Sequence, residues 1–416
     1  MKPNNIKILE KLEKFYNVVD IYKYKTSTAW INIKNYIYSK SLNYDFFIEN
    51  QKLDKKKALY FVFLSFINLF RQKGDVLFVG AGSGIMQIDE QYIDIYKDAI
   101  QEKNIIYFTS IDRLDRMYQA KEFYKKNHII VHSLLFSVIR NIIAKFMKNR
   151  VVLNDDEIIR FLEESNISIS NDDIKYIYAK FKAGYHIYKF LFKFYNIKKA
   201  YIVSSYSNTE MIAVLKEKNI EVIEIQHGLI GEMHRGYNYK IKSKLLPTPN
   251  TIMVYDEFWK QELIDADYYQ SEQIKIFEKF QYKKVKNIKI FNKKFIVFTG
   301  QGIFKDEIEN FFYNSIKFLE ENDLYLVYLP HPSENFNFDI SSEYIKILNQ
   351  KEYLTEQYIK SAIAHISIYS SCHFDAIHFH NKTFVFDVMK DNIMDYYKNK
   401  YPQNVIYIKN LDEVIK

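Results

Sequence analysis

The chain has 416 residues, which is enough for two domains that each bury a core. Hydrophobic residues make up 48% of it and charged residues 26%, a balance that excludes a disordered chain and a bundle of membrane helices. The net charge of +8 is mild for this length and its lysines are scattered, so a nucleic-acid-binding module is not indicated. Cys372 is the only cysteine, which excludes an internal disulfide and a cysteine-based zinc site and predicts a cytoplasmic location.

The first 72 residues are predicted to be mostly helical, and their N-terminal stretch lacks the apolar core of a signal peptide. The longest apolar run, residues 58–70, lies between a lysine triplet and Arg71. It is too short to span a bilayer and is predicted to be a buried helix. Any membrane contact is therefore expected to be peripheral, with the excess of lysine attracted to the inner face of the cytoplasmic membrane.

Strands and helices alternate along the rest of the chain, which predicts mostly parallel sheets covered by helices on both faces. Strands are predicted in the first half at residues 75–79, 105–108, 129–131, 200–204 and 222–225, with long helices between 155 and 198. They are predicted in the second half at residues 251–255, 295–299, 324–329, 364–369, 383–388 and 405–408, with the clearest helix at 305–321.

The tripeptide Pro247-Thr248-Pro249 is stiff and poorly helical, so it suits a linker between domains. We therefore predict an α/β protein of two doubly wound, Rossmann-like domains that face each other across a cleft. The N-terminal domain would comprise residues 1–247 with helical insertions, and the C-terminal domain residues 250–416. The segment 256–289 is predicted to be helical or irregular.

A first glycine cluster, Gly80-Ala81-Gly82-Ser83-Gly84, follows the first predicted strand. It resembles motif I of methyltransferases that use S-adenosylmethionine, but Phe78 stands where these enzymes usually carry an acidic residue. A dinucleotide fingerprint would need glycine where Ile85 stands. The alternative is an ordinary turn between a strand and a helix.

A second cluster, Gln226-His227-Gly228, ends the apolar strand 222–225. The carboxyl edge of an open α/β sheet is where ligands bind, and the glycine allows close approach of a ligand. His227 is a candidate general base, because the ordinary pKa of histidine lies near neutral pH. His234 and Arg235 follow closely and could meet an anionic group. The alternative is a structural histidine at a strand end.

Three further clusters lie at predicted strand ends in the second half. Gly300-Gln301-Gly302 would let the backbone pass close to a bound group, and His331, fixed between Pro330 and Pro332, could donate to a phosphate oxygen. Ser370 and Ser371 precede a helix, whose free N–H groups and dipole favour an anion. The alternative for Ser371 is a plain helix cap. The histidines at positions 365, 373, 378 and 380 with Asp375 do not have the spacing of three metal ligands on one helix face, so no metal site is predicted.

The series Gln226-His227-Gly228, His331-Pro332 and Ser370-Ser371 resembles GT-B glycosyltransferases of bacterial surface polysaccharide synthesis, in capsule and lipopolysaccharide. The last two motifs are similar to the HP and SS motifs of sialyltransferases and Kdo-transferases that use CMP-sugars. The resemblance covers residues 200–390 and departs from the sialyltransferases in one respect. Their acidic-acidic-glycine motif, which supplies the base, is missing from the N-terminal half.

This resemblance implies a metal-independent transferase without a cofactor, with a nucleotide-sugar donor and a glycan or lipid-linked glycan acceptor. It places His331, Pro332, Ser370, Ser371 and the loop 300–302 on the donor. The residues Gln226, Gly228, His234 and Arg235 are assigned to the acceptor side, and His227 and His331 are the candidate catalytic residues. The series is also similar to CDP-glycerol glycerophosphotransferases, so a polyol-phosphate transferase is the main alternative. Methyl transfer through Gly80–Gly84 is a further one.

Overall fold

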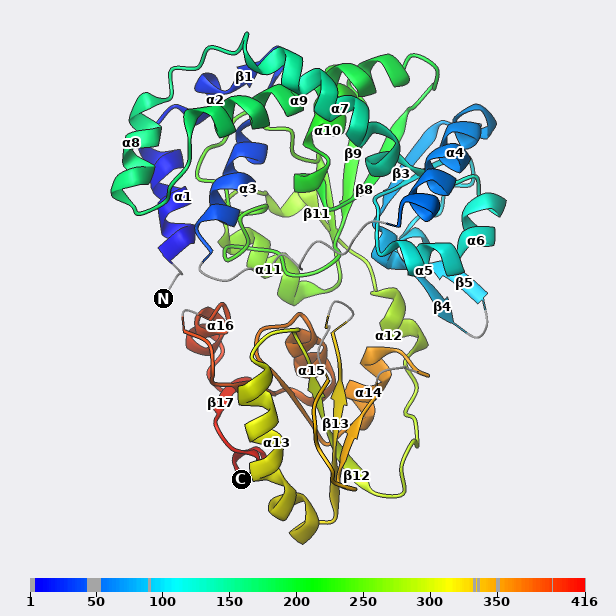
Figure 1. Ribbon diagram of the computed structural model, residues 1–416, viewed down its shortest axis with the longest axis vertical. Coiled ribbons are helices and arrows are strands. Elements are labelled where there is room, and N and C mark those ends of the chain that lie inside the picture. The colour runs from blue at the N-terminus through cyan, green and yellow to red at the C-terminus, as the bar shows by residue number, and fades with distance from the viewer. Residues whose placement is uncertain are drawn as a thin grey trace. The chain divides into compact units, whose positions relative to one another are not determined.

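The computed structural model describes residues 4–42, 54–88, 91–331, 334, 337–348, 352–390 and 392–415 (Figure 1). The chain divides into two compact units, which we call the N-terminal unit (Asn4–Phe280) and the C-terminal unit (Gln281–Lys416). Each unit is built around one large sheet. No helix among the described residues is both long enough and apolar enough to cross a membrane.

The sheet of the N-terminal unit has seven strands, and every pair of neighbours is parallel. In spatial order the strands are β11 (Ile274–Ile276), β10 (Thr251–Val254), β9 (Glu221–Ile225), β8 (Lys199–Val203), β3 (Val76–Gly80), β6 (Ile105–Thr109) and β7 (Ile130–Val131). Two small antiparallel pairs stand apart from it: β1 (Lys23–Tyr24) with β2 (Ser27–Thr28), and β4 (Ile85–Ile88) with β5 (Gln91–Asp94).

Helices cover both faces of this sheet, because successive residues of its strands point to opposite sides. Leu77 and Val79 of β3 join a core that includes residues of the helices α1, α3, α7, α9 and α10, whereas Phe78 joins a second core that includes residues of α4, α5 and α6. The helices of the unit are α1 (Asn4–Phe15), α2 (Val18–Ile21), α3 (Trp30–Lys40), α4 (Lys55–Arg71), α5 (Leu114–Gln119), α6 (Lys121–Lys126), α7 (His132–Lys148), α8 (Asp156–Glu164), α9 (Asn171–Leu191), α10 (Thr209–Glu217) and α11 (Glu257–Asp265), with α12 (Phe280–Lys284) at the boundary.

The sheet of the C-terminal unit has six parallel strands. In spatial order they are β14 (Ile345–Ile347), β13 (Leu324–Leu329), β12 (Lys294–Thr299), β15 (Ala364–Ser367), β16 (Thr383–Phe386) and β17 (Val405–Ile408). Its helices are α13 (Lys305–Glu321), α14 (Thr355–Ser361), α15 (Cys372–His380) and α16 (Met394–Lys400). One face packs on α13, and the opposite face packs on α14 and α15.

The strand order of each sheet reverses at one point. In the N-terminal unit the chain moves outward from β3 to β6 and β7 and then returns to β8 on the other side of β3. In the C-terminal unit it moves from β12 to β13 and β14 and returns to β15 on the other side of β12. The loops at such a switch point leave in opposite directions and open a crevice at the carboxyl edge of the sheet, where open α/β sheets bind ligands.

The predicted α/β class with two doubly wound units is confirmed. The division between the units lies 33 residues beyond Pro247, after Phe280, because β10 pairs with β9 and β11 pairs with β10 in the first sheet. The strands β9 and β10 lie on opposite sides of Pro247 and Pro249, and their pairing keeps both in one sheet although the segment between them is stiff. The strands β11 and β14 and the β4–β5 hairpin were not predicted, since each is short and only weakly apolar.

The prediction of a buried helix at residues 58–70 is only half right. Helix α4 does form there, and its N-cap Asp54 accepts hydrogen bonds from the N–H groups of Lys56 and Lys57. One face, which includes Phe61 and Leu64, is buried. The opposite face is also apolar, yet it is exposed: Phe63 is 65% exposed and Phe70 is 75% exposed.

Two buried histidines lie beneath the switch point of the C-terminal sheet. Nδ1 of His365 and Nδ1 of His373 lie 2.9 Å and 2.8 Å from the Thr383 hydroxyl, and Nε2 of His365 lies 2.9 Å from the Thr299 hydroxyl. Burial lowers the pKa of His373 from 6.5 to about 3 and holds the pKa of His365 well below its usual range. Both rings are therefore neutral and link β12, β15, β16 and α15.

We expect this unit to lose stability in acid. The folded unit keeps His373 neutral, whereas the unfolded chain protonates it below its ordinary pKa of 6.5, so the unfolded chain binds more protons in that window. The contribution is complete above pH 6.5 and decreases as the pH falls toward 3, by about 2 kcal/mol at pH 5. Denaturant unfolding of the full chain between pH 7.5 and 5 measures it.

The variant His373→Gln should flatten this pH dependence, and His378→Gln, which changes an exposed histidine of the same helix, should leave it as in the parent. Equal slopes for the parent and His373→Gln would contradict the assignment.

Candidate functional site

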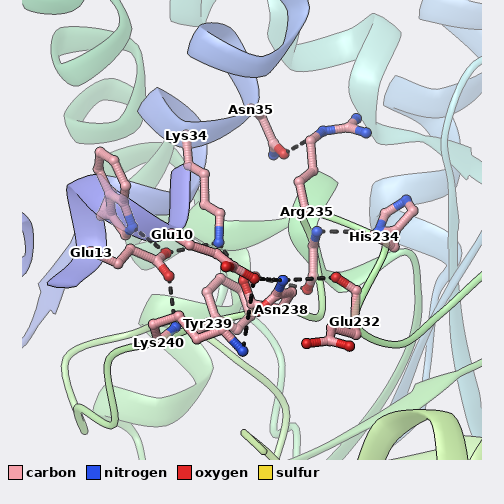
Figure 2. Close-up of polar contacts among 12 residues, drawn as sticks. Glu10, Glu13, Lys34, Asn35, Glu232, His234, Arg235, Asn238, Tyr239 and Lys240 are labelled. Atoms are coloured by element: carbon pink, nitrogen blue, oxygen red, sulfur yellow. Dashed lines mark hydrogen bonds and ion pairs between the residues drawn. The ribbon is translucent and has the colours of Figure 1, made fainter. Parts of the chain in front are cut away.

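The segment 226–240 follows β9 and is tied down by a buried ion pair in the N-terminal unit (Figure 2). Nζ of Lys34, on α3, lies 2.7 Å from Oε1 of Glu13 and donates to the carbonyl of Asn238 at 2.5 Å. The same carboxylate accepts from the indole of Trp30 and, at 2.7 Å, from the N–H of Lys240. Each buried charge is thus paired and hydrogen-bonded, as its desolvation requires.

A second acid strengthens this anchor. The side-chain amide of Asn238 donates to Oε1 of Glu10 at 2.9 Å and to the carbonyl of Glu232 at 2.7 Å (Figure 2). Burial lowers the pKa of Lys34, and the neighbouring Glu13 carboxylate works against that shift. The turn from 232 to 240 is therefore held by side chains from α1 and α3, far from it in sequence.

The ring of Tyr206 lies at the centre of the residues that this segment presents. Its hydroxyl lies 3.2 Å from Nε2 of His227, and its ring centroid lies 5.0 Å from that of His234 and 5.9 Å from that of Tyr237. Tyr206 comes from the loop after β8, and the histidines come from the loop after β9, the adjacent strand. The structure thus brings together three of the predicted residues, His227, His234 and Arg235, around a tyrosine that the sequence analysis did not select.

The guanidinium of Arg235 is held by rings and an amide. It lies 4.6 Å from the ring centroid of Tyr38 and 5.5 Å from that of Tyr206, and its Nε donates to Oδ1 of Asn35 at 2.9 Å (Figure 2). No carboxylate of the described chain lies within ion-pair distance of it. A fixed cation whose charge is not neutralised is suited to bind an anionic group.

The two histidines are neutral at physiological pH. Burial lowers the pKa of His227 from 6.5 to about 4. Burial, helped by the nearby charges of Arg235 and Lys34, holds the pKa of His234 well below its usual range, and Nδ1 of His234 accepts from the N–H of Gly236 at 3.1 Å. Nδ1 of His227 is buried without a hydrogen-bond partner among the described residues. His227 therefore keeps an unused nitrogen, and the only cation of this cluster is Arg235.

A buried acid, Glu224, lies in β9 beside this cluster. Oε1 of Glu224 accepts from the hydroxyl of Tyr237 at 2.8 Å and from the N–H of Ser205 at 2.9 Å. Burial raises the pKa of Glu224 from 4.5 to about 7. The side chain has no exposed surface. It positions Tyr237 and the start of the loop after β8, and it cannot touch a ligand without a rearrangement.

Of the two residues assigned to the acceptor side next to His227, Gln226 has a structural role and Gly228 has none. Gln226 is buried, donates to the carbonyl of Gly228 at 2.9 Å and accepts from the N–H of Tyr255 at 2.9 Å, so it holds the turn. A Cβ at Gly228 would meet no atom within 4 Å, and Gly228 does not have a positive φ. Neither packing nor backbone conformation explains this glycine, and the space beside it is open for a ligand.

In the C-terminal unit the two predicted donor-binding loops lie side by side. The loop 300–302 follows β12, Ser370 and Ser371 follow β15, and these two strands are paired neighbours at the switch point. The hydroxyl of Ser367 donates to the carbonyl of Thr299 at 2.7 Å and so joins the two strand ends. Gly302 has a φ of 73°, which favours glycine.

The sequence predicted free N–H groups at the start of α15, but the first three N–H groups of this helix are hydrogen-bonded within the chain. The N–H of Cys372 donates to Oγ of Ser370, and the N–H groups of His373 and Phe374 donate to the carbonyls of Ser370 and Ser371. Ser371 does not cap the helix with its side chain, and it is exposed. The hydroxyl of Ser371 is therefore available to a ligand, with the helix dipole behind it.

His331 is exposed at the end of β13 and lies beside an acid that the sequence analysis overlooked. Oε2 of Glu334 accepts from the N–H of His331 at 3.2 Å and from the hydroxyl of Tyr328 at 2.9 Å. A Cβ at Gly300 would come within 2.7 Å of the same carboxylate oxygen. A carboxylate here favours a hydroxyl-rich group over a phosphate, in contrast to the phosphate role predicted for His331. Pro332 lies outside the described residues.

The glycine cluster 80–84 packs against the protein itself. It continues into a short 3-10 turn and the β4–β5 hairpin, whereas a nucleotide-binding loop would continue into a helix. A Cβ at Gly80 would come within 2.9 Å of Oδ2 of Asp94, and one at Gly82 within 2.7 Å of Cβ of Asp112. These glycines make room for neighbouring side chains. No observation favours methyl transfer, and no group of three or more metal-ligating side chains occurs in the described part of the chain.

The side chains that the sequence analysis missed carried weak signals. Tyr206 lies in Ser204-Ser205-Tyr206-Ser207-Asn208, a polar loop after an apolar strand, and Glu224 is a single acid within an apolar strand. Asn35 and Tyr38 lie on α3, about 200 residues before Arg235, and no local pattern links them to it.

Substitution of Gly228 should separate binding from folding. We expect Gly228→Leu to leave the melting temperature near that of the parent, because the new side chain enters open space, and to impair ligand binding at His227. Gly236→Ala is the matched control, since its methyl group would lie 2.5 Å from Cδ1 of Tyr206 and should destabilise the unit by about 1–3 kcal/mol. Thermal unfolding of both variants measures this, and a large loss of stability in Gly228→Leu would contradict it.

No family model and no curated protein match the chain. Among solved structures, it is similar to the UDP-GlcNAc 2-epimerase from Methanocaldococcus jannaschii, with 12% identity, a TM-score of 0.45 and coverage of 81% of this chain and 89% of that chain. It is similar to a glycotransferase of kitacinnamycin, with 8% identity, a TM-score of 0.47 and coverage of 82% of this chain and 87% of that chain. It is also similar to the spinosyn rhamnosyltransferase SpnG, with 9% identity, a TM-score of 0.45 and coverage of 81% of this chain and 87% of that chain. At these identities and TM-scores the similarities identify neither a family nor an activity.

Proposed function

We propose that the protein is a glycosyltransferase that moves a sugar from a nucleotide-activated donor to a glycan acceptor. The observation that carries the proposal is the meeting of the loop 300–302 and Ser370–Ser371 at the switch point of the C-terminal sheet. Ser370 and Ser371 belong to the motif series that resembles the GT-B glycosyltransferases, and the loop 300–302 is the segment that the resemblance implies beside the donor. The sequence resemblance and the strand order thus both support a donor site at the carboxyl ends of β12 and β15.

The C-terminal unit has the chemistry for a nucleotide donor. The hydroxyl of Ser371 and the dipole of α15 favour a phosphate, which carries the charge of the leaving group. The Glu334 carboxylate, beside Gly300 and His331, suits hydroxyl groups of the ribose or of the sugar. On this proposal His331 binds the donor near Glu334, and Ser370 holds the helix start through the N–H of Cys372.

The N-terminal unit has the chemistry for an acceptor. His227 is neutral and lies next to open space, and on this proposal its Nε2 leaves the Tyr206 hydroxyl and takes the proton from an acceptor hydroxyl while that oxygen attacks the anomeric carbon. The bond from that carbon to the donor phosphate breaks, and the phosphate leaves with its electron pair. Tyr206 orients the ring of His227, and Arg235 binds an anionic group of the acceptor.

The HP and SS motifs support a CMP-linked donor with a sugar of the sialic acid or Kdo type. The acceptor on this proposal is a surface glycan, free or carried on a lipid, and the protein works in the cytoplasm at the inner face of the membrane.

A nucleotide screen tests the donor side. We expect CMP or CDP to raise the melting temperature of the full chain, because a ligand at 100 times its dissociation constant raises the free energy of unfolding by about 2.7 kcal/mol. The variant Ser371→Ala should lose most of that shift. The variant Ser341→Ala, an exposed serine of the same unit, should keep it. The comparison set is UMP, UDP, GDP and S-adenosylmethionine.

A shift with uridine or guanosine nucleotides alone would discard the CMP-sugar assignment and keep a nucleotide site. A response to S-adenosylmethionine alone would overturn the proposal. Transfer of phosphorus to the acceptor, followed by ³¹P NMR once a donor is known, would identify a polyol-phosphate transferase in its place.

The pH profile of kcat/KM tests the base. A base works when deprotonated, so His227 with a pKa of about 4 predicts activity that is retained from pH 7 down to about 5 and falls through pH 4. Glu224 as base would make activity fall below pH 7. We expect His227→Gln to lower kcat by about 10²–10⁴ without changing the nucleotide shift.

Glu224→Gln is the control for this profile and should keep both its acid limb and the shape of the parent curve. An acid limb near pH 7 that disappears in Glu224→Gln would transfer the role of base from His227 to Glu224.

A further inference from the structure

An exposed apolar stripe runs along helix α4 of the N-terminal unit. Leu59 is 69% exposed, Phe63 65%, Phe66 54% and Phe70 75%. These four residues recur every three or four positions and so share one side of the helix. A helix of a globular unit normally has its apolar side in the core and a polar side in solvent. Helix α4 is apolar on its buried side and also on its exposed side.

The orientation of α4 is fixed, so the stripe cannot turn into the core. On its buried side the hydroxyl of Ser65 accepts from the N–H of Val131 at 2.9 Å, and the side-chain amide of Asn68 donates to the carbonyl of Ile129 at 2.9 Å. The bonds join α4 to Val131 of the edge strand β7 and to Ile129, the residue before that strand. Rotation of the helix would break them and expose Phe61, which is fully buried.

Helix α7, which packs against α4, carries a second apolar stripe. Val138 is 62% exposed, Ile139 48%, Ile142 51% and Phe146 78%. We call these eight residues of α4 and α7 the apolar face. Both helices belong to the upper part of the N-terminal unit in Figure 1.

The charges on these helices all have one sign. Residues Lys55–Arg71 include four basic side chains and His132–Lys148 include three, and neither helix contains an Asp or Glu. Lys55, Lys56, Arg71 and Lys145 are exposed, and none of these four pairs with an acid of the described chain. The chain as a whole has 51 acidic residues, and none of them lies on these two 17-residue helices.

We propose that the apolar face binds the surface of an anionic lipid bilayer. Phenylalanine and leucine side chains enter the boundary between headgroups and acyl chains, and the lysines at the ends of the helices contact the anionic headgroups. This is the arrangement of a helix that lies on a membrane and does not span it. The binding requires neither the donor site nor His227.

The charges also argue against a second copy of the chain as the occupant. In a symmetric dimer each face meets the same face of its partner. The four basic side chains of these helices that pair with no acid of the described chain, Lys55, Lys56, Arg71 and Lys145, would then be brought toward the same four of the partner, and neither helix offers an acid to pair with them. An anionic bilayer supplies the opposite charge over the whole face.

Co-sedimentation of the full-length protein with vesicles tests the proposal. Vesicles of phosphatidylcholine with phosphatidylglycerol should bind the parent protein, and vesicles of phosphatidylcholine alone should bind it far less. The variant Phe63→Ser/Phe146→Ser should weaken binding about tenfold or more, since each side chain is exposed and its loss removes apolar area from the contact. Phe15→Ser, which changes a phenylalanine of α1 that is 75% exposed, is the matched control and should bind as the parent does.

The charge contribution is tested separately with Lys55→Gln/Lys56→Gln, which should weaken binding to the anionic vesicles roughly tenfold. Lys317→Gln, an exposed lysine of α13, is its control. Equal binding of the parent and the double phenylalanine variant would overturn the proposal. So would a dimer in sedimentation velocity that Phe63→Ser dissociates, because the apolar face would then be an interface between copies, and so would vesicle binding that is lost equally in Phe15→Ser.

Discussion

The parallel pairing of every strand in the two large sheets is the constraint on which the sites depend. Parallel neighbours end at the same edge, so the loops that leave β8 and β9, or β12 and β15, start next to each other although the residues are distant in sequence. The strand order reverses between β12 and β15, and loops that leave such a switch point open a crevice. Tyr206 and His227 meet at such an edge in one unit, and the loop 300–302 meets Ser370 and Ser371 at the switch point of the other.

Burial of charge is the second physical theme of the N-terminal unit. Lys34 can lie in the interior because Glu13 and the carbonyl of Asn238 surround its ammonium group, and the bonds that satisfy it also fix the segment 226–240. The same lack of water keeps His227 and His234 neutral and raises the pKa of Glu224. Arg235 remains as the cation of this cluster, held between Tyr38 and Tyr206. Neutral imidazole rings beside a fixed positive charge are the result.

Helix α4 shows how one segment can serve the interior and the outer surface at once. Ser65 and Asn68 hold it on β7 through bonds to main-chain groups, and its second apolar side stays outside. An apolar surface of this kind costs free energy in water, and the two helices that carry it contain basic side chains and no Asp or Glu. The composition of the helix thus distinguishes it from an ordinary buried helix, although its hydrophobicity alone does not.

The sequence by itself determined the α/β class, most of the strands and the residue types at the strand ends. Apolar runs and glycines report local requirements of burial and backbone conformation, so Gly300, Gly302, His227 and Ser371 could be selected without a structure. It did not determine the boundary after Phe280, because strand pairing of β10 and β11 is a long-range choice.

Only the tertiary structure decided which side chains meet. The bond of Arg235 to Asn35 spans 200 residues and the pair of Lys34 with Asn238 spans 204, distances over which a sequence pattern carries no information. The structure also separated the glycines by cause: Gly82 makes room for Asp112, whereas Gly228 faces open space. The conformational preference of a residue depends on its neighbours in the chain, whereas its packing depends on its neighbours in space. The side-chain contacts could therefore be known only from the folded chain.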